Sequence, residues 1–326
     1  VDFVKLYLSD SYEEIAPVRL LVILYFLTFL ACCFYFAYPG KNFIPIIHYG
    51  FVASIFSHFL LIVSRVYILG RAPVANLYES VIFVSFIAAI ASYLFARKRL
   101  KKEKDNFILF IAAGAFLSFL LSVIAFAMQP TEEFAVLAAV LNSNFWLATH
   151  VLMISTAYAI ALLAGILAHI LLFMMVTNKI TGRKLQNFDR SILVITILAL
   201  FFTITGTILG GIWADQSWGR FWGWDPKENG ALLLALWLIW ILHARLIKSL
   251  TIAHYNLALV ITNIIIALSW FGVNLLNVGL HSYGFTDDMR LGTYLFSFAA
   301  IELSFILYIY IKLKKQKIRL AKLMIQ

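Results

Sequence analysis

The chain has 326 residues, of which 63% are hydrophobic and only 13% are charged. Because a soluble domain carries roughly 25% charged residues, this composition excludes a water-soluble globular fold. The two cysteines, Cys32 and Cys33, are adjacent, a spacing that rarely meets disulfide geometry, and no Cys-x-x-Cys motif occurs, so the sequence disfavours a thiol-redox role.

Nine apolar runs follow one another along the chain, and each approaches the roughly 20 residues that a helix needs to cross a bilayer. The fifth is long enough to tilt or to extend beyond the bilayer. The sequence therefore predicts an all-α polytopic membrane protein with about nine transmembrane helices. The membrane domain is expected over residues 17–311, with residues 1–16 before it and a basic tail over 312–326. The runs cover residues 17–38, 45–64, 77–96, 106–127, 146–176, 191–212, 230–247, 256–277 and 291–311.

The distribution of Lys and Arg predicts the orientation of these spans. One set of loops and the C-terminal tail carry 19 of the 26 Lys and Arg residues, and the opposite set carries seven. Since cytoplasmic loops are enriched in basic residues, we expect the N-terminus outside and the C-terminus inside. The net charge of +10 is therefore a topology signal and requires no nucleic-acid partner. Residues 1–16 begin with Val and contain no export signal, which favours a preceding membrane or extracytoplasmic module, fused here or removed.

The predicted outer loop over residues 213–229 is the most unusual segment. It holds four of the eight tryptophans, Trp213, Trp218, Trp222 and Trp224. An interfacial aromatic belt is the simpler explanation, but a belt scatters aromatic residues over many span ends. Glycine between the rings, at positions 219 and 223, permits close approach of a flat ligand, and Trp offers a large rigid face. The loop is therefore interpreted as a platform for a flat apolar macrocycle.

At this loop the chain resembles a known family. The run Trp218-Gly-Arg-Phe-Trp222-Gly-Trp224-Asp225 is similar to the W-G-x-x-W-x-W-D signature of the haem-handling proteins of cytochrome c biogenesis, which include the CcsA/ResC, CcmC and CcmF types. The continuation through Glu228 and the segments 70–79 and 279–285 resemble the CcsA type. The similarity extends from about residue 45 to residue 310. It implies that haem b is both substrate and ligand, and that it contacts Trp218, Trp222, Trp224, Gly219, Gly223, Arg220 and Asp225.

Three histidines are predicted haem ligands. His150 lies at the outer end of the fifth span and His281 in the outer loop between the eighth and ninth spans. Both are at the level of the tryptophan loop, and in the resembling family the corresponding positions hold the outer haem. His243 lies about 20 Å below the outer surface, from a rise of about 1.5 Å per residue. Its His-x-Arg context with Arg245 resembles the ligand of a second haem inside the membrane, opposite a histidine of a CcsB-type partner.

The other histidines carry no family motif. A lone His in an apolar helix is more often hydrogen-bonded to a neighbouring helix than bound to a metal. We interpret His58, His169 and His254 as structural. For His48, on the predicted cytoplasmic side, we hypothesise a position near a haem entry route.

The charged residues near the predicted outer surface can be interpreted as structural or as ligand-binding. Glu79 needs a partner in hydrocarbon, and Arg65 or Arg71 can supply it. Asp225 and Glu228 sit where a helix N-terminus favours negative charge, with Pro226 suited to the first helical position. Outside, against the charge rule, Arg220 and Lys227 are suited to haem propionates. Glu302 in the ninth span has no assigned role.

The resemblance implies that the chain transports haem and presents it on the outer face for thioether attachment to the Cys-x-x-Cys-His motif of an apocytochrome c. No such motif occurs in this chain. The implied activity is that of a haem lyase acting together with a CcsB/ResB-type module, of which this chain is the CcsA part in a CcsB–CcsA fusion or a separate partner. Apocytochrome c, thioredoxin-like thiol reductants and membrane lipid are the other expected partners, in a bacterial inner membrane. No nucleophile or acid–base pair is required of this chain.

Two alternatives remain open at the sequence level. A b-type electron-transfer subunit would place stacked histidine pairs within two facing spans, whereas the outer pair here lies at a span tip and in a loop. A haem exporter without attachment activity would share the tryptophan platform. Covalent haem on a coexpressed apocytochrome separates export from attachment.

The topology is directly testable. In a background with Cys32 and Cys33 replaced by Ser, we expect Ser217→Cys to react with a membrane-impermeant thiol reagent in intact spheroplasts. Lys101→Cys should react only after lysis, because its basic loop is predicted to be cytoplasmic. Labelling of both positions from the same side would refute the orientation.

Overall fold

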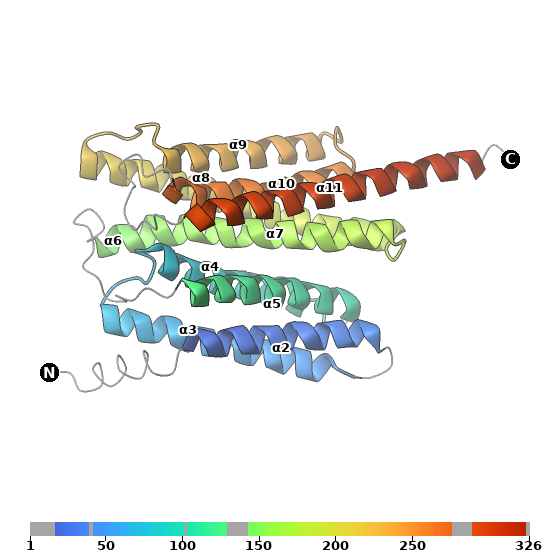
Figure 1. Ribbon diagram of the computed structural model, residues 1–326, viewed down its shortest axis with the longest axis horizontal. Coiled ribbons are helices and arrows are strands. Elements are labelled where there is room, and N and C mark those ends of the chain that lie inside the picture. The colour runs from blue at the N-terminus through green and yellow to red at the C-terminus, as the bar shows by residue number, and fades with distance from the viewer. Residues whose placement is uncertain (1–16, 39–41, 101–102, 129–142, 276–288, 324–326) are drawn as a thin grey trace. The chain divides into compact units, whose positions relative to one another are not determined.

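The computed structural model describes residues 17–38, 42–100, 103–128, 143–275 and 289–323 (Figure 1). Within these ranges nine helices are long and apolar enough to cross a membrane, which confirms the predicted all-α polytopic fold. The fifth span is continuous from Asn144 to Val176. The elements are α2 (Pro17–Ala37), α3 (Ile44–Leu69), α4 (Leu77–Arg97), α5 (Lys104–Ala127), α6 (Asn144–Trp146), the π-turn η2 (Leu147–Val151), α7 (Leu152–Val176), α8 (Gly182–Trp218), α9 (Pro226–Leu246), α10 (Ile252–Trp270), the 3₁₀ turn η3 (Gly272–Leu275) and α11 (Met289–Leu323).

Several helices extend beyond their apolar cores. The segment expected to be loop from residue 213 is helical as far as Trp218, and α9 begins at Pro226 rather than at residue 230. The basic segment after residue 311 continues α11 to Leu323. Apolarity marks the part of a helix that lies in hydrocarbon. It does not mark helix ends that project from the bilayer, where Lys and Arg are good helix formers.

The chain divides into two compact units. Unit 1 comprises Val1–Leu163 and Phe201–Trp222. In it α4 packs against α5, and α5 packs against α2 (Figure 1). Small residues allow the close approach of α4 and α5: a Cβ added to Gly114 would lie 2.4 Å from Ser92. Across the same interface Ser118 Oγ donates to the Ser85 carbonyl at 2.9 Å. Such contacts are typical of helix association in lipid.

Unit 2 comprises Ala164–Leu200 and Gly223–Gln326. In it α10 packs against both α9 and α11. The backbone of α9 approaches α10 at Gly230, where Ser269 Oγ donates to the glycine carbonyl at 3.1 Å. Further along the same pair, Trp237 Nε1 donates to Thr262 Oγ1 at 3.1 Å. Polar side chains thus fix α9 against α10 at two levels.

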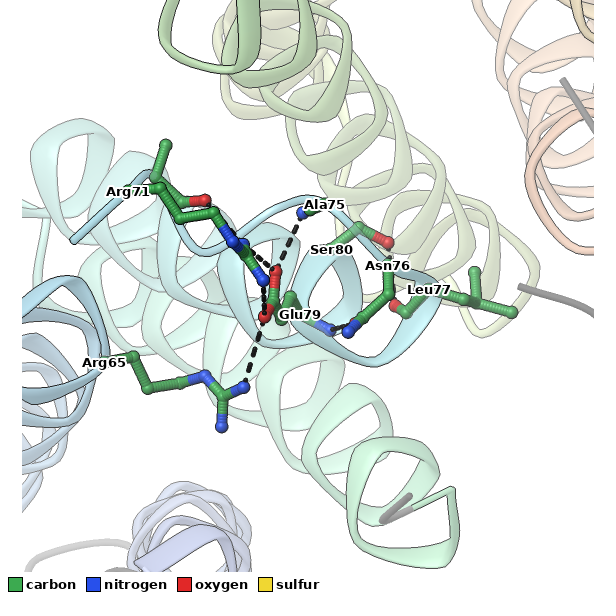
Figure 2. Close-up of polar contacts among 8 residues, drawn as sticks. Arg65, Arg71, Ala75, Asn76, Leu77, Glu79 and Ser80 are labelled. Carbon is green, nitrogen blue, oxygen red and sulfur yellow. Dashed lines mark hydrogen bonds and ion pairs between the residues drawn. The ribbon is translucent and has the colours of Figure 1, made fainter. Parts of the chain in front are cut away.

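A buried ion cluster closes one end of unit 1. Asn76 caps α4 by accepting a hydrogen bond from the Glu79 amide at 2.8 Å, which places the Glu79 side chain in the first turn. Figure 2 shows the two guanidinium groups that converge on this carboxylate. Arg71 donates to both carboxylate oxygens, at 2.8 and 3.0 Å, and Arg65 donates to one of them at 3.3 Å. The Ala75 amide supplies a fourth donor at 2.8 Å. Both predicted pairings of Glu79 are therefore present.

The cluster is costly to disturb because its members are out of water. The Glu79 side chain is 0% exposed, and those of Arg65 and Arg71 are 2% and 11% exposed. Removing one partner of a buried pair leaves the opposite charge uncompensated, which typically destabilises a protein by about 3–5 kcal/mol. Since Glu79 faces two cations, it is the member on which the cluster depends.

Glu79→Gln should therefore destabilise the protein by about 3–5 kcal/mol. We expect a clear fall in the melting temperature of the purified protein in detergent. Glu103→Gln is the matched control, because Glu103 is exposed and its carboxylate accepts from the nearby Asn106 amide; its effect should stay below about 1 kcal/mol. Equal melting of the two variants would show that the cluster does not hold this end of unit 1.

Candidate functional site

His150 lies in a π-helical turn at the start of the fifth span. α6 leads into η2 (Leu147–Val151), and the regular helix α7 follows. Such turns are frequent at functional sites, because the extra residue moves a side chain out of the regular helical register. Apolar periodicity gives no signal for this turn, and the sequence predicted an uninterrupted helix here.

The ring of His150 is held by α8. Its Nδ1 lies 2.8 Å from the Gly206 carbonyl. Gly210, one turn further along α8, makes room for the ring, since a Cβ there would lie 2.6 Å from Cε1 of the imidazole. Trp213, almost another turn on, meets the imidazole edge to face at 5.7 Å. The spacing of these three residues forms a recess for one imidazole on one face of α8.

The contact with Gly206 also selects the tautomer of a neutral His150 ring. A carbonyl oxygen only accepts hydrogen bonds, so Nδ1 of His150 must carry the proton. The lone pair then lies on Nε2, the state in which a neutral imidazole binds a metal. A carbonyl on the other ring nitrogen is the usual support of a metal-binding histidine. The side chain is thus arranged as an axial ligand requires.

A tryptophan pair stands beside this histidine. Trp146 and Trp213 stack with ring centroids 6.3 Å apart and planes 11° from parallel. The Trp146 indole donates to Gln216 Oε1 at 3.0 Å. Sequence reasoning missed Trp146, whose only signal was its place one helical turn before His150. The pair makes a rigid aromatic wall within unit 1.

The first half of the tryptophan motif ends α8. Trp218 is the last helical residue, and Gly219 follows with φ +67°, the left-handed conformation that closes many helices. The Arg220 guanidinium lies 5.8 Å from the Trp218 ring centroid, within cation–π range. Phe221 packs onto Gly211, where a Cβ would lie 2.5 Å from the phenyl ring. The positive φ of Gly219 favours glycine at this position, and its predicted role in ligand approach stays a prediction.

Trp224, in the second half of the motif, has a strained backbone. Its φ is +59°, which for a residue with a side chain costs on the order of 1–3 kcal/mol. Asn229 holds it by donating from Nδ2 to the Trp224 carbonyl at 2.9 Å. The side chain is 69% exposed. Strain of this kind persists where the surroundings enforce it, and here it directs a large indole outward.

A capping box supplies that enforcement. The Asp225 carboxylate accepts from the amides of Lys227 and Glu228 at 2.9 and 3.1 Å. The Glu228 carboxylate accepts from the amides of Gly223 and Asp225 at 2.7 and 3.2 Å. Pro226 occupies the first helical turn. The predicted helix start is confirmed, and Asp225 has a definite structural role in it.

His243 lies near the end of α9 and faces away from unit 2. Its Nδ1 lies 2.8 Å from the Ile239 carbonyl of the preceding turn, so Nδ1 is the donor and Nε2 is the nitrogen on the far side of the ring. The residue is exposed among the described residues. Two positions later, Arg245 turns the other way and donates to the buried Asp189 of α8 at 2.6 Å. Asn256 of α10 donates to the other oxygen of Asp189 at 2.9 Å.

Asp189 was not predicted as a site residue. It is the anchor that joins α8, α9 and α10 at the level of His243, and it fixes the rotation of α9 on which the outward direction of His243 depends. The available signal was the His-x-Arg motif itself, because an arginine at the end of an apolar span needs a counter-ion.

The remaining described histidines have protein partners. His58 bonds Tyr25 at 3.0 Å, and His254 bonds the helix-capping Thr251 at 2.9 Å. His169 lies 2.8 Å from the Glu302 carboxylate. These contacts fit the structural roles predicted from the sequence. His281 lies outside the described residues, so its place opposite His150 stays a prediction.

Comparisons with known proteins identify the family. The family model described as "Cytochrome C assembly protein" matches residues 74–281, more than half of the chain. Protein NrfI of Wolinella succinogenes is 32% identical over 240 residues, which cover 71% of this chain but only 25% of NrfI. The cytochrome c biogenesis protein CcsA of Vitis vinifera is 31% identical over 281 residues, covering 72% of this chain and 84% of that protein.

A solved structure shares the fold. The chain titled "Cytochrome c Heme Lyase CcmF" superposes with a TM-score of 0.63 and 16% identity, over 90% of this chain and 50% of the CcmF chain. At that identity the likeness concerns the fold alone. Sequence and family model carry the assignment: the chain belongs to the cytochrome c assembly protein family as a CcsA-type, multi-pass membrane protein with a role in cytochrome c maturation.

Proposed function

We propose that this chain carries haem b across a bacterial inner membrane and presents it on the outer face for thioether attachment to apocytochrome c. In this proposal it works as a haem lyase together with a CcsB/ResB-type module. The observation that carries the proposal is the His150 imidazole, whose Nδ1 is engaged by the Gly206 carbonyl at 2.8 Å. Nε2 is thereby the proposed ligating nitrogen, and the supporting carbonyl lies on α8, the helix that leads into the tryptophan motif.

The outer site rests on the properties of the individual side chains. His150 and His281 are the proposed axial pair, and Trp218, Trp222 and Trp224 are the proposed ring platform. Trp224 supports this role because its strained backbone keeps the indole exposed. Arg220 and Lys227 are suited to the haem propionates, since guanidinium and ammonium groups pair well with carboxylates.

The chemistry asked of the chain is positioning. A cysteine thiol of the apocytochrome adds across a haem vinyl group: sulfur bonds one vinyl carbon, and the thiol proton goes to the other. The apocytochrome histidine then replaces one outer ligand. Fixing the haem turns this addition into an intramolecular-like step, and the imidazoles tune the iron.

A second site is proposed at His243. Its outward-facing imidazole suits an axial ligand whose opposite number comes from a CcsB/ResB-type module. The Asp189–Arg245 pair at 2.6 Å supports this by holding the rotation of α9. Haem would pass this site before the outer one.

Loss of either outer ligand should abolish maturation. We expect His150→Ala and His281→Ala each to lower holocytochrome yield by at least about tenfold, as losses around metal ligands do. The reason is that the vacated iron takes water and is less readily kept ferrous. Haem stain of a coexpressed apocytochrome measures the yield, and added imidazole should restore part of it. Trp224→Ala should lose haem without such rescue, because imidazole cannot replace a ring face.

Two glycine substitutions test whether the position of the His150 ring is required, and not only the presence of the imidazole. Gly210→Ala places a methyl group 2.6 Å from Cε1 of His150 and should displace the ring. Gly50→Ala meets only Thr28 Oγ1 at 3.6 Å and should mature cytochrome normally. If His150→Ala and Gly210→Ala both give the wild-type yield of holocytochrome, the outer-site proposal is wrong and the tryptophan loop is only an interfacial aromatic belt. Retained haem transfer without covalent product would favour the exporter.

His243→Ala should lower the haem recovered with the purified protein, and imidazole in the medium should restore it. The matched control is His254→Ala, which removes a histidine bonded to its own helix cap. Haem per protein is measured as the pyridine haemochrome. Equal haem content in the two variants would remove His243 from the proposed route.

A further inference from the structure

One end of unit 1 carries a tyrosine–histidine pair that the proposed outer and membrane sites do not use. His48, in the first turns of α3, lies with Nε2 3.0 Å from the Tyr93 hydroxyl near the end of α4. The two rings stack, with centroids 5.9 Å apart and planes 15° from parallel. Tyr49 stacks on the imidazole at 5.1 Å, and Phe107 meets it edge-on at 5.9 Å. Four aromatic rings from three helices therefore gather at this end.

Unit 1 also contains an internal comparison. Tyr25 and His58 make the same hydroxyl–imidazole contact at 3.0 Å, but both residues are 0% exposed and lie among phenylalanines. That pair is core packing. His48 and Tyr93 are only partly buried, and the neighbouring Tyr49 is 69% exposed. The two pairs therefore share the same hydrogen bond and differ in how exposed their side chains are.

The charges around the pair favour an anionic ligand. Arg97 and Lys98 follow Tyr93 by one turn and are exposed. Arg99 turns inward instead, with its guanidinium 4.5 Å from the Phe110 ring centroid. The nearby acids are engaged: Glu103 accepts from Asn106, and Asp105 accepts from Tyr35 at 2.8 Å. The distribution of basic residues predicts that this end faces the cytoplasm.

We propose that the Tyr93–His48 pair is a receiving site for ferric haem, with the Tyr93 oxygen as the iron ligand. This rests on the proposed function as a haem carrier. His48 accepts the phenol proton, the exposed Tyr49 ring faces the macrocycle, and Arg97 and Lys98 meet the propionates. Tyrosinate is an established protein ligand of haem iron.

Binding is a ligand exchange without redox change. The phenol proton of Tyr93 moves to Nε2 of His48, tyrosinate oxygen bonds iron(III), and the water held by the iron leaves. The histidine becomes an imidazolium beside the phenolate. Because an anionic oxygen ligand favours the harder ferric ion, the site is expected to prefer ferric over ferrous haem.

The test uses the full chain purified in detergent and titrated with ferric haem. Resonance Raman spectra of the wild type should show iron–phenolate modes. Tyr93→Phe should lose them, and its ferric haem affinity at this site should fall by at least about tenfold. His48→Ala should shift the appearance of the phenolate modes to higher pH, because the proton acceptor is gone.

Two controls keep the result specific. Tyr25→Phe removes the buried counterpart, and Tyr67→Phe removes a phenol that is exposed elsewhere on α3; both should keep the phenolate modes. Imidazole-bound haem in the wild type without any phenolate mode would overturn this site and leave the proposed function standing. A wild-type protein that binds no haem would overturn both. The wild-type spectrum decides even where Tyr93→Phe fails to fold.

Discussion

Hydrocarbon offers no hydrogen bonds, so each polar group that this chain carries into the membrane must find its partner within the protein. The Glu79 carboxylate receives four hydrogen bonds, three from two arginines and one from a backbone amide. The Asp189 carboxylate receives one from Arg245 and one from Asn256. The partners of Asp189 lie far along the sequence, and those of Glu79 lie in the preceding helix and loop; these contacts restrict the rotation of the helices. The direction in which a neighbouring histidine points follows from that rotation.

The same constraint orients the imidazoles. His150, His169 and His243 each present Nδ1 to a backbone carbonyl at 2.8 Å. For His169 and His243 the carbonyl belongs to the preceding turn of the same helix, so the ring is positioned by its own span. For His150 it belongs to α8, the helix that ends at Trp218. The orientation of the proposed outer ligand therefore depends on the helix that begins the tryptophan motif.

Much of the fold could be predicted from sequence, because apolar runs mark spans whatever their tertiary contacts. The helix start at Asp225 was also predictable, since a capping box is local. The π-turn at His150 was not, because one extra residue leaves the apolar pattern intact. The left-handed backbone of Trp224 was also missed, because a positive φ at a residue with a large side chain has no sequence signal of its own. The role of Asp189 was not predicted, because it depends on partners that are distant in the sequence. An acidic residue at the end of a span has many possible partners of this kind.

Within unit 1 the two proposed haem-binding groups differ in ligand atom: Tyr93 offers an anionic oxygen and His150 a neutral nitrogen. Oxygen anions favour ferric iron, while imidazole accommodates the ferrous state as well. Thioether formation needs ferrous haem, and of the two groups it is the His150 imidazole that suits this state. The two proposed groups thus differ in the oxidation state of iron that each favours, and this difference follows from their ligand atoms alone.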